Sequence, residues 1–313
     1  MGGRRGVSLG RKGDRNMAVA ATQQLAGLAL ALDNLPPVTE LIADCRAEAD
    51  VVLPPLPTTS LRGALLPALR DRAPALLEHP GRPLAGAGVT DRAPAALVLA
   101  PDTAAVGRRR FELSAGERLA VRLVLIGERA ATCADAVVAA LRVALAGGIG
   151  RARGGGGHVP FALRDVSPAP ARAAAPAPAR ARIQLVTPAR IVHGGRVCAS
   201  LDGAALVAAA VRRADLLARV HGGGRLVPPG RVEPAIDTLG AAIAVAPVRR
   251  YSSRQGRAMT WPGLIGHVDV GGPDLPAAWP AIEFAARAGI GKATTFGFGR
   301  LSVSAAPDAG AAP

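Results

Sequence analysis

Aromatic side chains and cysteine are scarce in this chain of 313 residues. Two tryptophans, one tyrosine and five phenylalanines make up only 3% of it, so ring stacking cannot dominate an extended binding surface. The three cysteines, Cys45, Cys133 and Cys198, form neither a CxxC pair nor a cluster with histidine. That spacing argues against a structural zinc site and favours a reducing compartment.

Long apolar runs are missing as well. No run reaches the roughly 18 residues that a membrane-spanning helix needs. Arg4 and Arg5 precede a partly apolar stretch over 17–32, a pattern that permits a twin-arginine export signal as one interpretation. Gln23 and Gln24 interrupt the stretch, which favours the alternative of a basic tail followed by a strand. We therefore expect a cytoplasmic protein without a membrane partner.

Acidic residues are few relative to basic ones: 23 against 38, for a net charge of +15. Only two of the basic residues are lysines. GC-rich codon usage can produce that bias, but it does not explain the excess of base over acid. A positive chain attracts polyanions, so nucleic acid is the first class of partner and an anionic membrane surface the second. Apolar residues make up 50% of the chain, enough for packed cores, which excludes a disordered protein.

The domain organisation is set by one biased segment. Residues 167–182 alternate proline and alanine with arginine, a composition that cannot build a core and predicts an extended linker. We therefore expect a disordered basic tail over 1–16, an N-terminal domain over 17–167, a linker over 168–182 and a C-terminal domain over 183–313.

Three short sequences recur in the two halves, in the same order and about 140 residues apart. They are Leu-x-Gly-Ala at 61–64 and 201–204, Leu-Ile-Gly at 125–127 and 264–266, and Gly-Ile-Gly at 148–150 and 289–291. One such match is common in a chain rich in alanine and glycine, but three in order indicate that one domain has been duplicated.

Hydrophobic periodicity predicts similar elements in both halves. The first half predicts strands over 25–32 and 118–126 and helices over 60–70, capped by Ser60, and over 134–146. The second predicts strands over 183–186, 239–248 and 266–270 and helices over 202–220 and 277–288. Each half thus favours strand–helix–strand–strand–helix–strand. The expected fold class is α+β, with two tandem ferredoxin-like domains, the arrangement that RNA-recognition motifs share.

One glycine-rich segment near the C-terminus stands out, GIGKATTFGFGRLSV over 289–303. Two Gly-apolar-Gly units flank five residues, and paired glycines allow a backbone to approach a ligand and to turn its amides toward an anion. Lys292 and Arg300 add positive charge. The segment is not a phosphate-binding P-loop, because Ala286 stands where that motif needs glycine. An ordinary glycine-rich turn is the alternative.

The spacing of this loop resembles the signature of the RAMP superfamily of CRISPR-associated RNA-binding proteins. Within it, the chain is similar to the repeat-processing endoribonuclease that matures CRISPR RNA, over most of residues 25–303. Four further segments carry the resemblance: 61–65 (LRGAL), 111–117 (FELSAGE), Thr187-Pro188 with Arg212-Arg213, and 250–255 (RYSSRQ) with Met259, Gly263 and Gly266.

The resemblance implies two ferredoxin-like domains and a metal-independent reaction. In that reaction a ribose 2′-OH attacks the neighbouring phosphate of the repeat RNA and leaves a cyclic phosphate and a 5′-OH. It implies no cofactor and no metal. The implied partners are the CRISPR precursor RNA and other CRISPR effector subunits, and a homodimer stays open. The alternative is a non-catalytic RAMP subunit that holds guide RNA in an effector complex.

Such a site needs a base, an acid and a cation for the charge on the phosphorane. Many members of the family place a catalytic histidine near the first helix, whereas the first histidine of this chain, His79, follows that helix. We predict His79, Tyr251 and Lys292 as catalytic residues. His158 is expected in a flexible loop, His221 at a helix end, and His193 and His267 in structural positions.

Basic and polar side chains near the loop are the candidates for RNA contact. Arg250, Ser252 and Arg254 would share one face of a strand. A charge run is often only a solvated face, but adjacency to the loop favours contact with phosphate. The predicted RNA-binding residues are Arg249, Arg250, Ser252, Arg254, Gln255, Arg257, Gly289, Gly291, Lys292, Thr294, Thr295, Gly297, Gly299 and Arg300. Arginines at 108–110 and at 151 and 153 form two further clusters.

Overall fold

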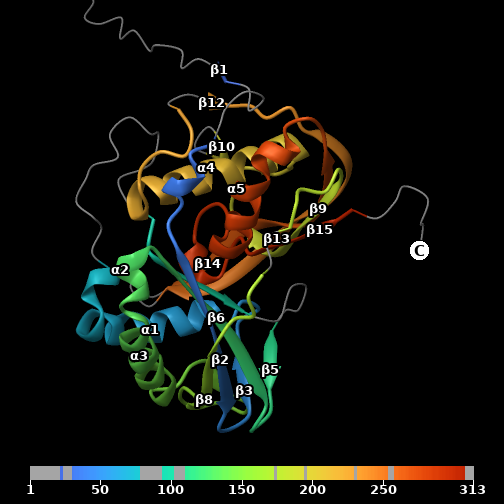
Figure 1. Cartoon of the computed structure of the whole chain (residues 1–313). Helices are drawn as coiled ribbons and strands as arrows, with labels where there is room; N and C mark the ends of the chain where they lie inside the picture. Colours follow the sequence, from blue (N-terminus) through green and yellow to red (C-terminus); the bar gives the residue numbers. More distant parts are fainter. Residues whose placement is uncertain are drawn as a thin grey trace, which may run out of the picture.

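The structure is a computed structural model (Figure 1). It describes residues 22–23, 30–77, 94–101, 110–172, 175–193, 196–228, 231–252 and 257–306. The basic tail expected over 1–16 lies outside these residues. No helix in the described part is both long and apolar enough to span a bilayer.

The first half of the chain folds around a four-stranded antiparallel sheet in the order β4-β6-β2-β8. Its strands are β2 (Val38–Ala47), β4 (Leu97–Pro101), β6 (Arg118–Ile126) and β8 (Phe161–Pro168). Helix α1 (Thr58–Arg72) follows β2, and helix α3 (Ala134–Ala146) follows β6. Both helices contribute leucines to one core with the strands, including Leu61, Leu65 and Leu69 from α1.

The second half repeats this plan with the sheet order β13-β14-β9-β15. Its strands are β9 (Ala181–Ala189), β13 (Asp237–Ser252), β14 (Arg257–Gly271) and β15 (Leu301–Ala305). Helix α4 (Gly203–His221) follows β9, and helix α5 (Leu275–Ala288) follows β14. When the four strands of each sheet are numbered by their order in the chain, both sheets have the strand order 2-3-1-4. Two tandem ferredoxin-like domains are therefore confirmed.

Short elements complete the chain. In the first half they are β1 (Thr22–Gln23), a 3-10 turn (Leu32–Asn34), β3 (Val51–Leu53), a 3-10 turn (Pro74–Leu76), β5 (Phe111–Leu113), α2 (Glu128–Ala131) and β7 (Arg151–Ala152). In the second half they are β10 (Val192–His193), β11 (Arg196–Val197), β12 (Arg231–Val232) and a 3-10 turn (Thr294–Phe296). Strands β5, β3 and β7 form a small separate sheet.

The duplication is visible where each domain's second helix ends. Gly148 and Gly150 follow α3, and Gly289 and Gly291 follow α5, all four with φ between 70° and 83°. Each pair encloses a buried isoleucine. The recurring Gly-Ile-Gly sequence therefore marks the same structural position in both domains.

Two sequence predictions in the first domain are wrong. The strand expected over 25–32 is contradicted at its described end, because Leu32–Asn34 forms a 3-10 turn and the first sheet strand begins at Val38. Ser60 does not cap α1. The helix begins at Thr58 with Pro57 at the cap position, and Thr59 Oγ1 donates to Leu56 O, 2.8 Å away. Ser60 lies inside the first turn.

The two domains meet at one end of the first sheet, where β2 and β6 approach the second domain (Figure 1). Val98, Val124 and Ile126 point away from α1 and α3 and join the apolar core of the second domain, to which α5 belongs. Arg287 on α5 also donates to Glu40 and to the carbonyl of Val38 on β2. One end of the sheet face that RNA-recognition motifs use for bases is therefore covered in this domain, whereas Arg46 and Arg118 at the other end stay exposed.

Candidate nucleic-acid interface

The glycine-rich loop after α5 has a conformation that only glycine tolerates at its key positions. Gly297 has a φ of 91°, and a Cβ there would lie 2.1 Å from Thr58 Oγ1. Gly299 has a φ of 74°, and its Cβ would lie 2.0 Å from Ile290 O. Ala293 is the only described residue other than glycine with a positive φ, 67°, which is a strained conformation for a side chain with a Cβ. Close packing therefore explains the spacing of the motif.

Six backbone amides of this loop are used within the protein. Those of residues 289, 290, 292, 296, 297 and 299 donate to backbone oxygens of the chain. These six are therefore not directed outward, as they would be in a loop that cradles an anion. Gly289, Gly297 and Gly299 are moreover buried. The structure thus gives these predicted RNA-binding glycines a role in shaping the loop.

A buried arginine on α4 donates hydrogen bonds to the loop. Arg213 of α4 is 8% exposed, and it donates to Gly289 O (3.3 Å), Ala288 O (3.5 Å) and Thr294 Oγ1 (3.2 Å). No carboxylate of the described residues pairs with it, and burial lowers the pKa of Arg213 to about 10. Thr294, predicted to bind RNA, is buried against this guanidinium.

The top of the loop meets the first turn of α1. Thr58 Oγ1 donates to Phe296 O at 2.8 Å, and Arg62 Nε donates to Thr295 Oγ1 at 3.1 Å. The first turn of α1 and the loop thus fix one another although more than 230 residues separate them in sequence. This junction joins the two domains at a surface that neither domain forms alone.

The long hairpin of β13 and β14 reaches the same junction. Val248 on β13 is buried against Leu56 and Phe298, and Trp261 on β14 packs against this cluster. Beyond it the strands carry Arg249 and Arg257, both exposed. The structure therefore places the basic end of the hairpin beside the loop. The order of these segments in the sequence does not by itself predict this contact.

Four side chains form a row across this junction, which we call the aromatic–arginine row: Arg62, Phe296, Trp261 and Arg190. The Arg62 guanidinium lies 3.9 Å from the centre of the Phe296 ring. Phe296 and Trp261 meet edge to face with ring centres 5.3 Å apart. The Arg190 guanidinium lies 4.8 Å from the Trp261 ring centre. The row alternates charge and ring surface, a combination that suits nucleic acid.

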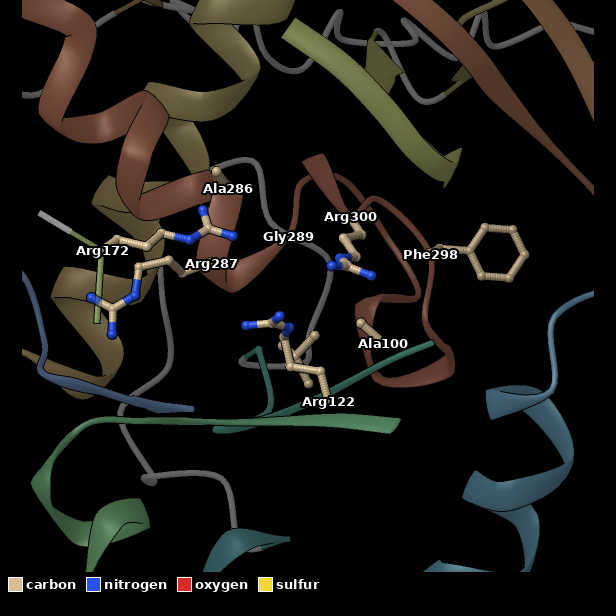
Figure 2. A pocket seen from close by; sticks show the side chains of 9 residues that line it. Ala100, Arg122, Arg172, Ala286, Arg287, Gly289, Phe298 and Arg300 are labelled. Atoms are coloured by element: carbon tan, nitrogen blue, oxygen red, sulfur yellow. The ribbon is translucent and has the colours of Figure 1, made fainter. Parts of the chain in front are cut away.

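A small pocket lies behind the loop, between the domains (Figure 2). Figure 2 shows Arg122, Arg172, Arg287 and Arg300 around it. Glu40 accepts hydrogen bonds from Arg287 and Arg122. Burial alone would raise the pKa of Glu40, but these two bonds outweigh burial and hold it below its ordinary value. Four arginines line the pocket, and Glu40 pairs with only two of them, so the pocket carries an excess of positive charge.

The predicted site residues not yet described fall into three groups. Lys292 is exposed on the loop, and Arg300 is half-buried and donates to Pro101 O. Tyr251 lies on β13 with Arg250 and Ser252, where the structure describes the backbone but not these side chains. The other three predictions, His79, Arg254 and Gln255, lie outside the described residues.

Two of the other histidines are bonded away from the junction. His158 Nδ1 lies 2.6 Å from Gly150 O, next to the first domain's own glycine-rich turn. His221 ends α4, as predicted, and its Nε2 lies 2.8 Å from Pro94 O. His267 lies on β14 opposite Gln184 of β9. Across the described residues, no group of three or more His, Cys, Asp or Glu side chains is arranged to hold a metal ion.

Sequence reasoning did not select four residues of this site: Arg62, Arg190, Trp261 and Phe296. Arg62 stood within a recognised motif, and Trp261 lay between the recognised residues Met259 and Gly263. The chain's scarcity of aromatics could have drawn attention to Trp261 and Phe296. Their meeting depends on tertiary contacts that no local pattern predicts.

A comparison with protein-family models identifies the second domain. Residues 183–301 match the model described as CRISPR-associated endoribonuclease Cas6. The second domain is therefore similar to the Cas6 family, in agreement with the resemblance that the loop carries. A second model, described as an N-terminal domain, matches residues 35–183.

Solved structures share most of the fold. A Cas6 product complex has a TM-score of 0.53 at 18% identity, covering 85% of this chain and 100% of the other. A second Cas6 product complex, of a Thermus thermophilus protein, has a TM-score of 0.55 at 15% identity over 86% and 100%. A partial Cas6-RT-Cas1–Cas2 complex has a TM-score of 0.55 at 11% identity over 90% and 48%. At these identities the likeness establishes the fold. No curated protein sequence matches the chain.

Proposed function

We propose that this chain, whose second domain is similar to the Cas6 family, binds the repeat RNA of a CRISPR precursor transcript and cleaves it where α1, the loop and the hairpin meet. One observation carries the proposal. Basic side chains from both domains converge there, with Arg62 from the first and Arg190, Lys292, Arg249 and Arg257 from the second. Such a surface attracts a phosphate backbone, and it exists only when the domains are assembled.

The proposed reaction needs no metal. A base removes the proton of a ribose 2′-OH, the oxygen attacks the adjacent phosphorus in line, and the 5′-oxygen leaves with a proton from an acid. The products are a 2′,3′-cyclic phosphate and a 5′-OH. We assign the general base to His79 and the proton transfer at the leaving oxygen to Tyr251.

The charge on the phosphorane needs a fixed cation. Arg62 meets this requirement because Thr295 and the Phe296 ring hold its guanidinium in place. Lys292 sits exposed on the same loop, next to the strained Ala293. We assign both residues to phosphate contact, with Lys292 at the reacting group. A pre-organised cation of this kind stabilises charge without first rearranging.

The partners we propose are repeat RNA and other CRISPR proteins. The Cas6 product complexes and the Cas6-RT-Cas1–Cas2 assembly support this assignment by family likeness. Arg249, Arg257 and the neighbouring Arg250, Ser252, Arg254 and Gln255 would contact RNA along the hairpin. The homodimer stays a prediction.

A second function is favoured by one observation. His158 and His221, two of the histidines with described side chains, are bonded at other positions in the fold. A chain without a histidine base at the junction would bind RNA with the same surface and release no product. The alternative is therefore a RAMP subunit that holds guide RNA without cutting it.

Binding and cleavage are tested separately. Fluorescence anisotropy with a labelled repeat RNA carrying 2′-O-methyl riboses measures affinity without cleavage. We expect Arg62→Ala and Arg249→Ala each to weaken binding several-fold, because each removes a phosphate contact. Arg142→Ala, on the exposed side of α3, is the matched control and should bind as the wild type does. Wild-type affinity in the two site variants would contradict the proposed surface.

The catalytic assignment is tested with unmodified repeat RNA. We expect Lys292→Ala and His79→Ala to reduce the cleavage rate more than the affinity. Tight binding without any product from the wild-type chain would contradict the nuclease and support the RNA-holding subunit.

A further inference from the structure

We infer that the Trp261 end of the aromatic–arginine row is a subsite for one unpaired nucleotide, whose base packs against Trp261 and whose phosphate is bound by Arg190. The inference rests on the proposed function, because it takes the ligand to be RNA. It adds a contact that recognises a base rather than the backbone.

The distribution of aromatic residues is the first support. The chain has eight aromatic residues, and three of them, Trp261, Phe296 and Phe298, gather at this junction. They form a small cluster separate from the two main cores. Phe298 is buried within it, whereas Trp261 and Phe296 remain half-buried at the surface. Ring surface is thus kept accessible in a chain that has little of it.

The second support comes from the contacts of the Arg190 guanidinium. Its guanidinium lies over the Trp261 ring, and no described residue accepts a hydrogen bond from it or forms an ion pair with it. Burial, without a compensating carboxylate, lowers its pKa. Arg287 and Arg122, by comparison, both donate to Glu40. A half-buried guanidinium whose N–H groups have no acceptor in the described part of the chain is complementary to an anion, and a phosphate accepts two of them at once.

The surroundings decide which anion fits. Lys292 lies beside Arg190, since its amide donates to Arg190 O at 2.9 Å. Arg249 and the Trp261-bearing strand continue into the basic hairpin. A ring next to a guanidinium, with further basic side chains nearby, matches a nucleotide, which offers a flat base and a phosphate at fixed separation. The base must be unpaired, because paired bases are stacked inside a helix and their faces are hidden.

The chain's tryptophan content provides a direct assay. Trp261 and Trp279 are its only tryptophans, and Trp279 is buried in α5. In the Trp279→Phe variant of the full chain, all tryptophan emission comes from Trp261. We expect repeat RNA with 2′-O-methyl riboses to quench this emission, with the same Kd that anisotropy gives. If Trp279→Phe does not fold, the difference between wild-type and Trp261→Phe emission reports the same signal.

A scan with abasic residues separates the base from the phosphate. Each abasic RNA keeps its phosphates and lacks one base. We expect a single position at which the quenching disappears. On intact RNA, Trp261→Ala should weaken binding roughly five- to 100-fold. On the RNA that lacks the base at that position, the same substitution should cause no further loss of affinity. Trp261→Phe should retain most of the affinity, and Arg190→Ala should weaken binding of intact and abasic RNA alike.

Two outcomes overturn the inference, and they differ. Binding of RNA by anisotropy with unchanged Trp261 emission would reject the nucleotide subsite and leave RNA binding intact. Quenching that persists with every abasic RNA would also reject it, since a phosphate alone would then be responsible. Absence of RNA binding by either method would instead overturn the proposed function, and this inference with it.

Discussion

Arg213 is the residue whose replacement tests the architecture of the loop most sharply. It is a buried cation that donates to the start of the loop, at Ala288 O and Gly289 O, and to its middle, at Thr294 Oγ1. Thr294 begins the turn whose next residues contact α1. We predict that Arg213→Met destabilises the protein and loosens the loop without removing any group from the surface.

The magnitude follows from two opposing effects. Each of the three oxygens that loses its donor stays buried, at a cost of about 1–3 kcal/mol. Removal of the guanidinium also relieves the desolvation of a cation that no described carboxylate neutralises, which offsets part of that cost. We expect a net loss of about 2 kcal/mol. Arg213→Lys should cost as much or more, because it retains the buried charge and offers a poorer fork of donors.

Urea denaturation measures these differences, and hydrogen exchange over residues 289–299 reports the loop itself. Arg212→Met, a change at the exposed neighbour on α4, is the control and should stay within about 0.5 kcal/mol of the wild type. A double-mutant cycle between Arg213→Met and Thr294→Val should show a coupling of about 1 kcal/mol. An Arg213→Met variant as stable as the wild type, with unchanged exchange in the loop, would refute the reasoning.

Three further predictions concern the domain interface and the loop. Glu40→Gln should cost about 2 kcal/mol in urea denaturation, because it leaves Arg287 and Arg122 without their carboxylate in a partly buried interface. The wild type should lose this contribution as the pH falls below the ordinary pKa of Glu40, 4.5, and through its lowered folded value, whereas Glu40→Gln should lack that part of the pH dependence. Gly297→Ala should displace the loop from Thr58, because its Cβ would lie 2.1 Å from the hydroxyl oxygen, and should therefore weaken RNA binding. Gly157→Ala, with open space around it, is the control. Equal RNA affinities for these two variants would contradict the packing argument.

Strong periodicity explains which elements the sequence could predict. Strand β6 and helix α3 have the predicted bounds, because large apolar residues define their buried faces. Strand β2 was missed because its buried positions are Ala43, Cys45 and Ala47, small residues that carry a weak signal. The opposed prolines Pro247 and Pro262 hid the length of the hairpin, since proline argues against a strand.

The site was predictable in part. The spacing of the loop and the family resemblance located its position in sequence, and the two-domain fold followed from the repeats. Arg213 could have been found, because it lies three residues after Ala210 and four before Leu217 on the buried side of α4. The contact of Arg62 with Thr295, and of Trp261 with Phe296, joins segments that only the folded chain brings together.

The central claim is that this chain cleaves RNA by attack of a 2′-OH. The most direct measurement incubates purified protein in EDTA with end-labelled repeat RNA, and with copies that carry one 2′-deoxyribose at successive positions. The account predicts one cut that persists in EDTA, a 2′,3′-cyclic phosphate on the product, and loss of the cut only when the deoxyribose lies immediately 5′ of the scissile phosphate. Cleavage that survives that deoxyribose, or that EDTA abolishes, would contradict it.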